Sequence, residues 1–105
     1  MRALVYAKNP KLQNVPEPQR LPGQALIRVE LAGICNTDIE ITQGYSNYRG
    51  ILGHEFVGKV VESDDLHLVD KRVVGSIDVP CGGCKFCRMN MPNYCSNRMT
   101  MGMDR

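Results

Sequence analysis

The chain has 105 residues, of which 43% are hydrophobic and 23% are charged, and its net charge is +2. This size fits one small globular domain, and the scattered basic residues form no patch that would favour nucleic-acid binding. No apolar run approaches the length of a membrane span, and Lys8 and Pro10 interrupt the only stretch that could serve as a signal peptide.

The first third of the chain is predicted to contain three strands. Residues 1–6 are a short apolar run, and residues 12–15 form a second run that Pro16 ends. A proline-containing extended segment follows. Residues 24–32 then alternate apolar with polar or charged side chains, which is typical of a half-buried strand, and Gly33 ends this strand.

A short helix and a loop are predicted next. Thr37 and Glu40 have the S/T-x-x-E spacing of a capping box, which predicts a helix that begins at Thr37. Gly44 is expected to end this helix. Residues 45–51 are predicted to form a loop in which Tyr45 and Tyr48 are surface side chains, unless they line a substrate entrance.

The second half of the chain again favours strands. Residues 56–62 are apolar and β-branched, and Gly58 within them predicts a bulge or a close backbone contact. Residues 71–79 predict another strand that ends at Pro80, and the remainder is expected to be a loop around the cysteines. Several short strands with almost no helix indicate a mainly β fold, either a small barrel or a sandwich.

Four cysteines form a candidate metal site: Cys81, Cys84, Cys87 and Cys95. Four thiolates complete a tetrahedral shell for zinc and leave no position for water, so such a metal would be structural. A ferredoxin-type cluster would need a shorter last gap followed by proline. Two disulfides or free buried thiols are the alternatives. The odd cysteine count and the CxxC spacing favour a metal in a reducing, cytoplasmic compartment.

A second candidate group combines Cys35, His54 and Glu55. A thiolate and an imidazole are good zinc ligands, and Glu55 could supply an oxygen unless the third ligand lies further along the chain. Asp38 is a candidate partner for the other ring nitrogen of His54, and the Thr37 hydroxyl could relay a proton. From residue types alone, ordinary packing or surface roles for Cys35 and His54 remain open.

Together these motifs resemble the zinc-containing medium-chain alcohol dehydrogenases. They are similar to the N-terminal catalytic domain of that family, which has a GroES-like β-barrel fold with short helices and a structural-zinc loop. The order and spacing of the matching segments make the resemblance specific. Besides the four-cysteine loop, these segments are Asn14-Val-Pro-Glu-Pro18, Gly23-Gln-Ala-Leu-Ile-Arg-Val29, Ala32-Gly-Ile-Cys-Asn-Thr-Asp38, Gly53-His-Glu55 with Gly58, and Asp70-Lys-Arg-Val73.

The resemblance implies a role for each candidate residue. Cys35 and His54 match two catalytic zinc ligands, and Glu55 matches an acid that binds this zinc or stands beside it. Thr37 matches the proton-relay hydroxyl, and Asp38 matches the acid behind the histidine. The four cysteines of the loop match the ligands of a structural zinc.

The departures from the family also carry expectations. Asn36 stands where some relatives carry an arginine that reaches the cofactor phosphates. Asn36 and Thr37 are the candidates for cofactor contact, but Asn36 lacks the positive charge of that arginine. A further catalytic ligand and the GxGxxG of a Rossmann domain do not occur in this sequence. We therefore expect residues 1–105 to be an incomplete GroES-like catalytic domain, and we expect the domain to continue past Arg105.

The resemblance implies a dehydrogenase that uses zinc and NAD or NADP. The full-length enzyme would oxidise a small alcohol or polyol to an aldehyde or ketone by hydride transfer, without a nucleic-acid or membrane partner. A homo-oligomer is left open, and the isolated chain is expected to be inactive. The alternative is a non-catalytic zinc-binding or protein-interaction module from a truncated gene.

Overall fold

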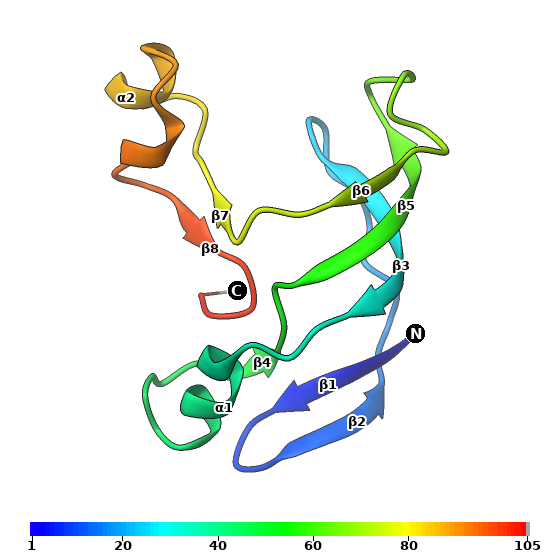
Figure 1. The fold of residues 1–105 in the computed structure, drawn as a ribbon, viewed down its shortest axis with the longest axis vertical. Coiled ribbons are helices and arrows are strands. Elements are labelled where there is room, and N and C mark those ends of the chain that lie inside the picture. The colour runs from blue at the N-terminus through cyan, green and yellow to red at the C-terminus, as the bar shows by residue number, and fades with distance from the viewer. Residues whose placement is uncertain (105) are drawn as a thin grey trace.

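The computed structural model describes residues 1–104 and confirms the predicted mainly β class. The strands are β1 (Arg2–Tyr6), β2 (Pro10–Asn14), β3 (Ala25–Ala32), β4 (Gly50–Ile51), β5 (Phe56–Ser63), β6 (Arg72–Val74), β7 (Asp78–Val79) and β8 (Met99–Thr100). They form three sheets, with the orders β2-β1-β4, β3-β5-β6 and β7-β8 (Figure 1). The helices are α1 (Asn36–Thr42), α2 (Lys85–Arg88) and the 3-10 turn η1 (Pro92–Tyr94). Within residues 1–104, no helix is long and apolar enough to cross a membrane.

The first sheet includes a strand inside the segment predicted to be a loop. Residues 50 and 51 form β4, which pairs antiparallel with Tyr6 and Val5 of β1. The prediction of Tyr48 as a surface residue is also wrong, because its side chain is buried and its hydroxyl donates to the carbonyl of Ile51 at 2.7 Å. Tyr45 is exposed, as predicted. A two-residue strand is too short to show a period, so only its pairing reveals it.

The second sheet confirms the close backbone contact expected at Gly58. This residue pairs with Val29 of β3, and a Cβ on it would lie 2.6 Å from the carbonyl oxygen of Arg28. A side chain at this position would therefore push the two strands apart. The register shift nearby lies between Val29 and Leu31, so the extra residue belongs to β3.

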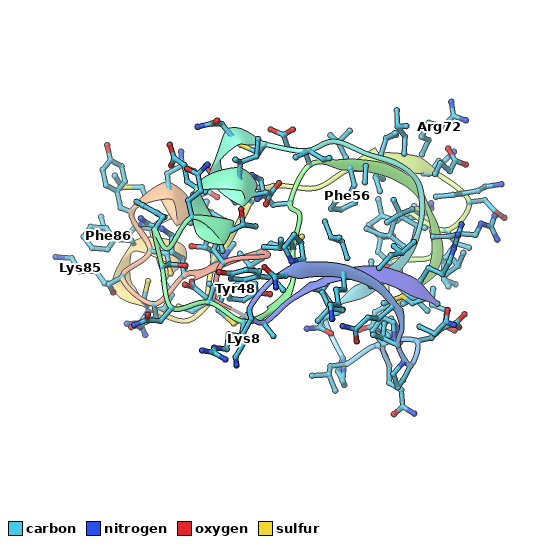
Figure 2. All side chains as sticks on the ribbon, turned by 90° about the horizontal axis from the view of Figure 1, so that it is seen from below. Lys8, Tyr48, Phe56, Arg72, Lys85 and Phe86 are labelled. Atoms are coloured by element: carbon cyan, nitrogen blue, oxygen red, sulfur yellow. The ribbon has the colours of Figure 1, made fainter. Side chains whose placement is uncertain are left out.

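The single strand predicted for residues 71–79 is wrong. The structure divides it into β6 and β7, with Gly75 between them. A Cβ on Gly75 would lie 2.4 Å from ring atoms of Phe56, so the backbone here crosses directly over that ring. Phe56 points into the interior, whereas Lys8 and Arg72 point outward (Figure 2). The chain leaves the second sheet at this crossing and continues into the four-cysteine lobe (residues 80–98).

Helix α1 begins before the residue predicted to cap it. Its N-cap is Cys35, whose backbone N–H donates to the Asp38 carboxylate at 2.9 Å. The Thr37–Glu40 capping box is therefore wrong, and Glu40 instead accepts a hydrogen bond from the side-chain amide of Asn36 at 3.0 Å. Two three-residue spacings overlap here, Cys35–Asp38 and Thr37–Glu40. The helix is capped by the first of these pairs.

The end of α1 agrees with the prediction. Gly44 has a φ of 96°, and the backbone N–H of Tyr45 returns to the carbonyl of Glu40 at 3.0 Å. This is the Schellman arrangement that favours glycine after a helix. The helix buries Ile41, which is fully inaccessible and belongs to a small core cluster. The cluster consists of Ile41, Tyr48 and Leu52, with Tyr6 and Met103 packed against it.

The strand of residues 24–32 is confirmed as β3, but its apolar side chains are incompletely covered. Val29 is 53% exposed and Leu31 is 70% exposed. Val29 also lines a groove of about 690 Å³ that residues of β1 border on its other side. The alternation of apolar and polar residues therefore predicted the strand correctly, but it did not predict how far its apolar side chains are buried.

Two candidate metal centres

The four-cysteine lobe contains local structure where a plain loop was predicted. Cys84 is the N-cap of α2, so Cys84 and Cys87 lie on one helical turn. The turn η1 leads directly into Cys95, which is buried at 1% exposure. A spacing of three residues thus becomes closeness in space because the chain coils between the ligands.

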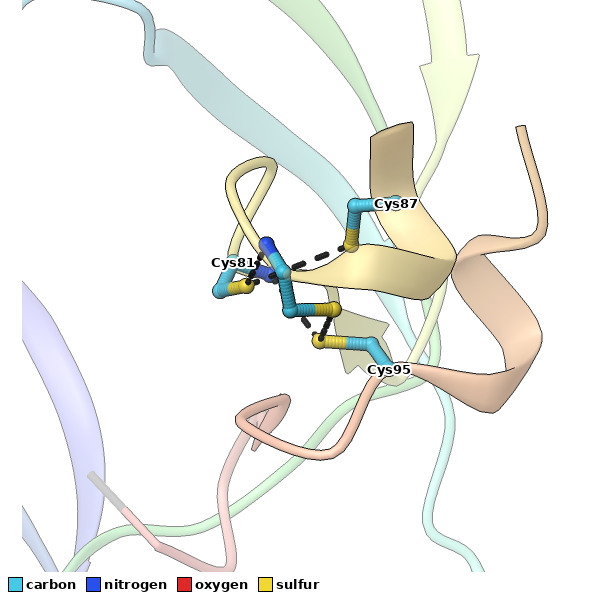
Figure 3. A group of neighbouring side chains, drawn as sticks. Cys81, Cys87 and Cys95 are labelled. Atoms are coloured by element: carbon cyan, nitrogen blue, oxygen red, sulfur yellow. Dashed lines mark hydrogen bonds between the residues drawn. The ribbon is translucent and has the colours of Figure 1, made fainter. Parts of the chain in front are cut away.

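The four sulfur atoms are arranged as a tetrahedral metal shell requires (Figure 3). All four lie within 4.8 Å of one another. The Cys84 and Cys95 sulfurs are 3.8 Å apart, and those of Cys81 and Cys87 are 4.0 Å apart. A zinc–sulfur distance of about 2.3 Å gives a tetrahedron edge of about 3.8 Å. All five cysteines of the chain are free, so the disulfide alternative does not match the structure.

Backbone N–H groups prepare two of these sulfurs to carry negative charge. The N–H groups of Gly83 and then Cys84 lower the pKa of Cys81, and the N–H of Cys87 lowers the pKa of Cys84 to about 6. Burial and the neighbouring Cys84 sulfur raise the pKa of Cys87 to about 12. Because metal ligands must be thiolates, metal binding has to displace at least the Cys87 proton at neutral pH.

The second centre is assembled from separate segments. Cys35, His54 and Glu55 each offer a ligand atom, and these atoms lie within 4.8 Å of one another. Cys35 stands between β3 and α1, whereas His54 and Glu55 immediately precede β5. The backbone N–H of Gly33 donates to the carbonyl of Glu55 at 2.9 Å, which extends the β3–β5 pairing by one step. This pairing brings the three predicted residues together.

Asp38 lies next to both Cys35 and His54 of the second centre. One carboxylate oxygen accepts the N–H of Cys35 at 2.9 Å, and the other lies 3.6 Å from Nδ1 of His54. Both Asp38 and His54 are buried. The placement behind the histidine follows the prediction, but the bond to Cys35 was missed. The three-residue spacing between Cys35 and Asp38 was the available signal, since it matches an N-cap and its reciprocal partner.

The chemistry of this group suits a metal ion. The facing atoms, Nδ1 of His54 and Oδ1 of Asp38, are buried without a hydrogen-bond partner at their present separation. A metal on Nε2 leaves the proton on Nδ1, and that proton then has the Asp38 carboxylate as its acceptor. One sulfur, one nitrogen and one oxygen are all ligand types that zinc takes, and three is the number of protein ligands at catalytic zinc sites, which keep one position open.

A pocket of about 450 Å³ adjoins the second centre. His54 and Glu55 line it together with the apolar side chains of Phe56, Val74 and Ile77. Each group has one exposed member, Cys81 in the lobe and Glu55 in the second centre. The pocket beside His54 and Glu55 gives a small molecule room next to the second centre.

The two remaining predicted site residues lie on the first turn of α1. The Thr37 hydroxyl is 3.7 Å from the Cys35 sulfur, so it stands next to the second centre. Asn36 is exposed and donates its side-chain amide to Glu40. The structure thus brings Thr37 to the site and leaves Asn36 on its outer side.

The chain is similar to known proteins over most or all of its length. The alcohol dehydrogenase GroES-like domain profile matches residues 21–103. The erythritol/L-threitol dehydrogenase of Mycolicibacterium smegmatis is 39% identical over 113 residues, which cover 90% of this chain and 31% of that protein. The solved structure of alcohol dehydrogenase TADH from Thermus sp. ATN1 covers 100% of this chain and 33% of its own, with 34% identity and a TM-score of 0.86.

A candidate zinc-binding dehydrogenase from Sinorhizobium meliloti 1021, solved with bound NADP, is also similar. It is 33% identical with a TM-score of 0.80, and the match covers 99% of this chain and 32% of that one. The chain therefore spans about a third of the length of these relatives.

Proposed function

The chain belongs to the alcohol dehydrogenase GroES-like domain family, and on that premise we propose that it is the N-terminal catalytic domain of a zinc-dependent, NAD(P)-linked alcohol or polyol dehydrogenase. One observation carries the proposal. Cys35, His54 and Glu55 converge within 4.8 Å beside a pocket, with the buried Asp38 behind the histidine. A module with only a structural zinc gives no reason for this second convergence.

Each residue of the second centre has a distinct task in this proposal. Cys35, His54 and Glu55 would hold the catalytic zinc, which would supply a Lewis acid for the substrate oxygen. Asp38 orients Cys35 and His54, because its carboxylate accepts the backbone N–H of Cys35 and faces the His54 ring. Thr37 takes the hydroxyl proton of the alcohol and passes it outward, since its own hydroxyl lies beside Cys35.

The four-cysteine lobe holds the structural zinc in this proposal. Its sulfur separations of 3.8 and 4.0 Å match a closed tetrahedral shell, which leaves no position for substrate. The lobe therefore contributes stability and takes no part in the chemistry.

The substrate class is a small alcohol or the corresponding carbonyl compound. The pocket beside His54 is small and mainly apolar, and an erythritol/L-threitol dehydrogenase is among the similar proteins. A bound NAD or NADP would supply the hydride acceptor. Asn36 and Thr37 are the proposed neighbours of that cofactor. Five free cysteines favour a cytoplasmic protein, because thiols persist in a reducing compartment.

Metal content and activity together test the proposal. The purified chain should bind two zinc ions, and Cys35→Ala or His54→Ala should each reduce this to one without loss of the folded lobe. When the domain is joined to a dinucleotide-binding domain, the same substitutions should abolish alcohol-dependent reduction of NAD(P). Unchanged activity in both variants would reject the assigned site.

A further inference from the structure

The turn of residues 101–104, at the carboxyl end of β8, lies directly against the loop that carries His54. Gly102 is buried in this turn, and a Cβ on it would lie 2.5 Å from the carbonyl oxygen of Gly53. It would also lie 3.0 Å from the carbonyl carbon and the nitrogen of Gly53. The two glycine backbones are therefore packed on each other, and Gly53 is the residue that precedes His54.

Both partners of this contact are held in place. Met103, the next residue of the turn, packs against the core cluster that contains Leu52, and Leu52 precedes Gly53. The turn itself is closed by Asp104, whose carboxylate accepts the backbone N–H of Thr100 at 2.7 Å. Gly102 and Gly53 also have positive φ angles of 70° and 110°, a backbone conformation that disfavours any residue with a side chain at either position.

The same turn is connected to the four-cysteine lobe. It continues from β8, and β8 pairs with β7 at both of its residues. The backbone N–H of Met101 donates to the carbonyl of Ile77 at 2.9 Å, which extends this pairing toward Gly102. Strand β7 leads into the lobe and β8 follows it (Figure 1), so a metal on the four sulfurs would hold the two stems of the lobe together.

We propose that Gly102 is a positioning residue that couples the two metal centres. Metal in the four-cysteine lobe holds the β7–β8 pair, this pair holds the 101–104 turn, and the turn holds Gly53 so that His54 faces Cys35. The inference rests on the proposed function in one respect, namely that the second centre binds a metal. Because coupling is reciprocal, occupancy of either site raises the affinity of the other.

Cobalt binding to the intact chain tests this coupling. Cobalt bound by four thiolates gives stronger charge-transfer absorption than cobalt bound by one thiolate, so the two sites can be followed separately. Gly102→Ala should lower cobalt affinity at the second centre about tenfold or more, with the four-thiolate signal still reaching one equivalent. Gly23→Ala is the matched control, since Gly23 has a φ of 79° and no atom within 4 Å of an added Cβ. Equal affinities at the second centre in both variants would overturn the proposal.

A measurement on the unmodified chain removes the risk that Gly102→Ala does not fold. Amide hydrogen exchange at Gly53 and His54 should slow when one equivalent of cadmium fills the four-thiolate site. Exchange that stays the same would overturn the coupling even if the chain binds two metals. An unmodified chain that binds a single cobalt ion would instead reject the second centre, and with it both the proposed function and the coupling.

Discussion

The two candidate metal centres differ in how the chain brings their ligands together. Between Cys81 and Cys95, one short lobe supplies all four sulfurs through α2 and η1. The second centre instead needs Cys35 from the end of β3 and His54 from the start of β5. One centre depends on local coiling and the other on the pairing of two strands.

This difference suggests that the four-cysteine centre serves stability and the second centre serves the chemistry. The lobe contributes no member to the core cluster of Ile41, Tyr48 and Leu52, so a metal is the natural means of holding it together. The second centre is positioned by buried groups such as Asp38 and opens on a pocket. Damage to the first centre should therefore unfold part of the chain, whereas damage to the second should change metal binding with little effect on folding.

The largest effect is expected from Cys84→Ser. The substitution opens the closed thiolate shell, and structural zinc supplies folding free energy directly. In the presence of zinc, the melting temperature should fall by about 10 °C or more, as measured by circular dichroism. Cys35→Ser is the control for loss of a thiol from the other centre, and it should change the melting temperature far less. An unchanged melting temperature for Cys84→Ser would contradict the structural assignment of the lobe.

Asp38→Asn should have the next largest effect, confined to the second centre. The change removes the charge that faces His54 and weakens the acceptor for the Cys35 N–H. Such supporting residues are typically worth about 10- to 100-fold in metal affinity, which competition with a zinc chelator can measure. Glu40→Gln, on the exposed side of the same helix, serves as the control. Equal losses in both variants would show that general charge, and not position, is responsible.

Gly33→Ala should have a smaller effect than Asp38→Asn on the zinc affinity of the second centre. A Cβ at this position would lie 2.9 Å from Oε2 of Glu55, so the flexible carboxylate should swing aside. We expect the zinc affinity of the second centre to fall by about fivefold, less than for a main ligand. Gly83→Ala is the matched control in the lobe, because no atom lies within 4 Å of its added Cβ. Zinc affinity in Gly33→Ala equal to that of the original chain would contradict a ligand role for Glu55 in its position beside Gly33.

The smallest expected effect is a difference in reactivity between two thiols of the lobe, and measuring it requires no substitution. In the metal-free chain, the N–H of Cys87 lowers the pKa of Cys84 to about 6, while burial raises the pKa of Cys87 to about 12. The Cys84 thiol should therefore react with iodoacetamide at pH 7 much faster than that of Cys87, as peptide mass spectrometry can determine. Its reactivity should decline as the pH falls through about 6. Equal rates would show that the backbone does not prepare these sulfurs for metal.

Much of the fold could be predicted because its signals are local. Gly44 ended the helix as expected, since only a residue that tolerates positive φ suits that position. The family resemblance implied a GroES-like domain, and the match over residues 21–103 confirms it. The errors came where a contact distant in sequence decided the structure. Gly75 interrupts a predicted strand because the Phe56 ring lies beneath it, and Tyr48 is buried because it belongs to the core cluster against which Tyr6 of β1 packs.

The sequence by itself determined the four-cysteine lobe, because ligands a few residues apart can reach one ion through local turns alone. It also indicated which residues to expect at the second centre, but the residue types left ordinary packing roles open. Only the tertiary structure decided that Cys35, His54 and Glu55 meet, that Asp38 faces the His54 ring, and that Gly102 rests on Gly53. Those contacts depend on the register of paired strands and on the approach of distant backbones, and spacing along the chain does not encode either one.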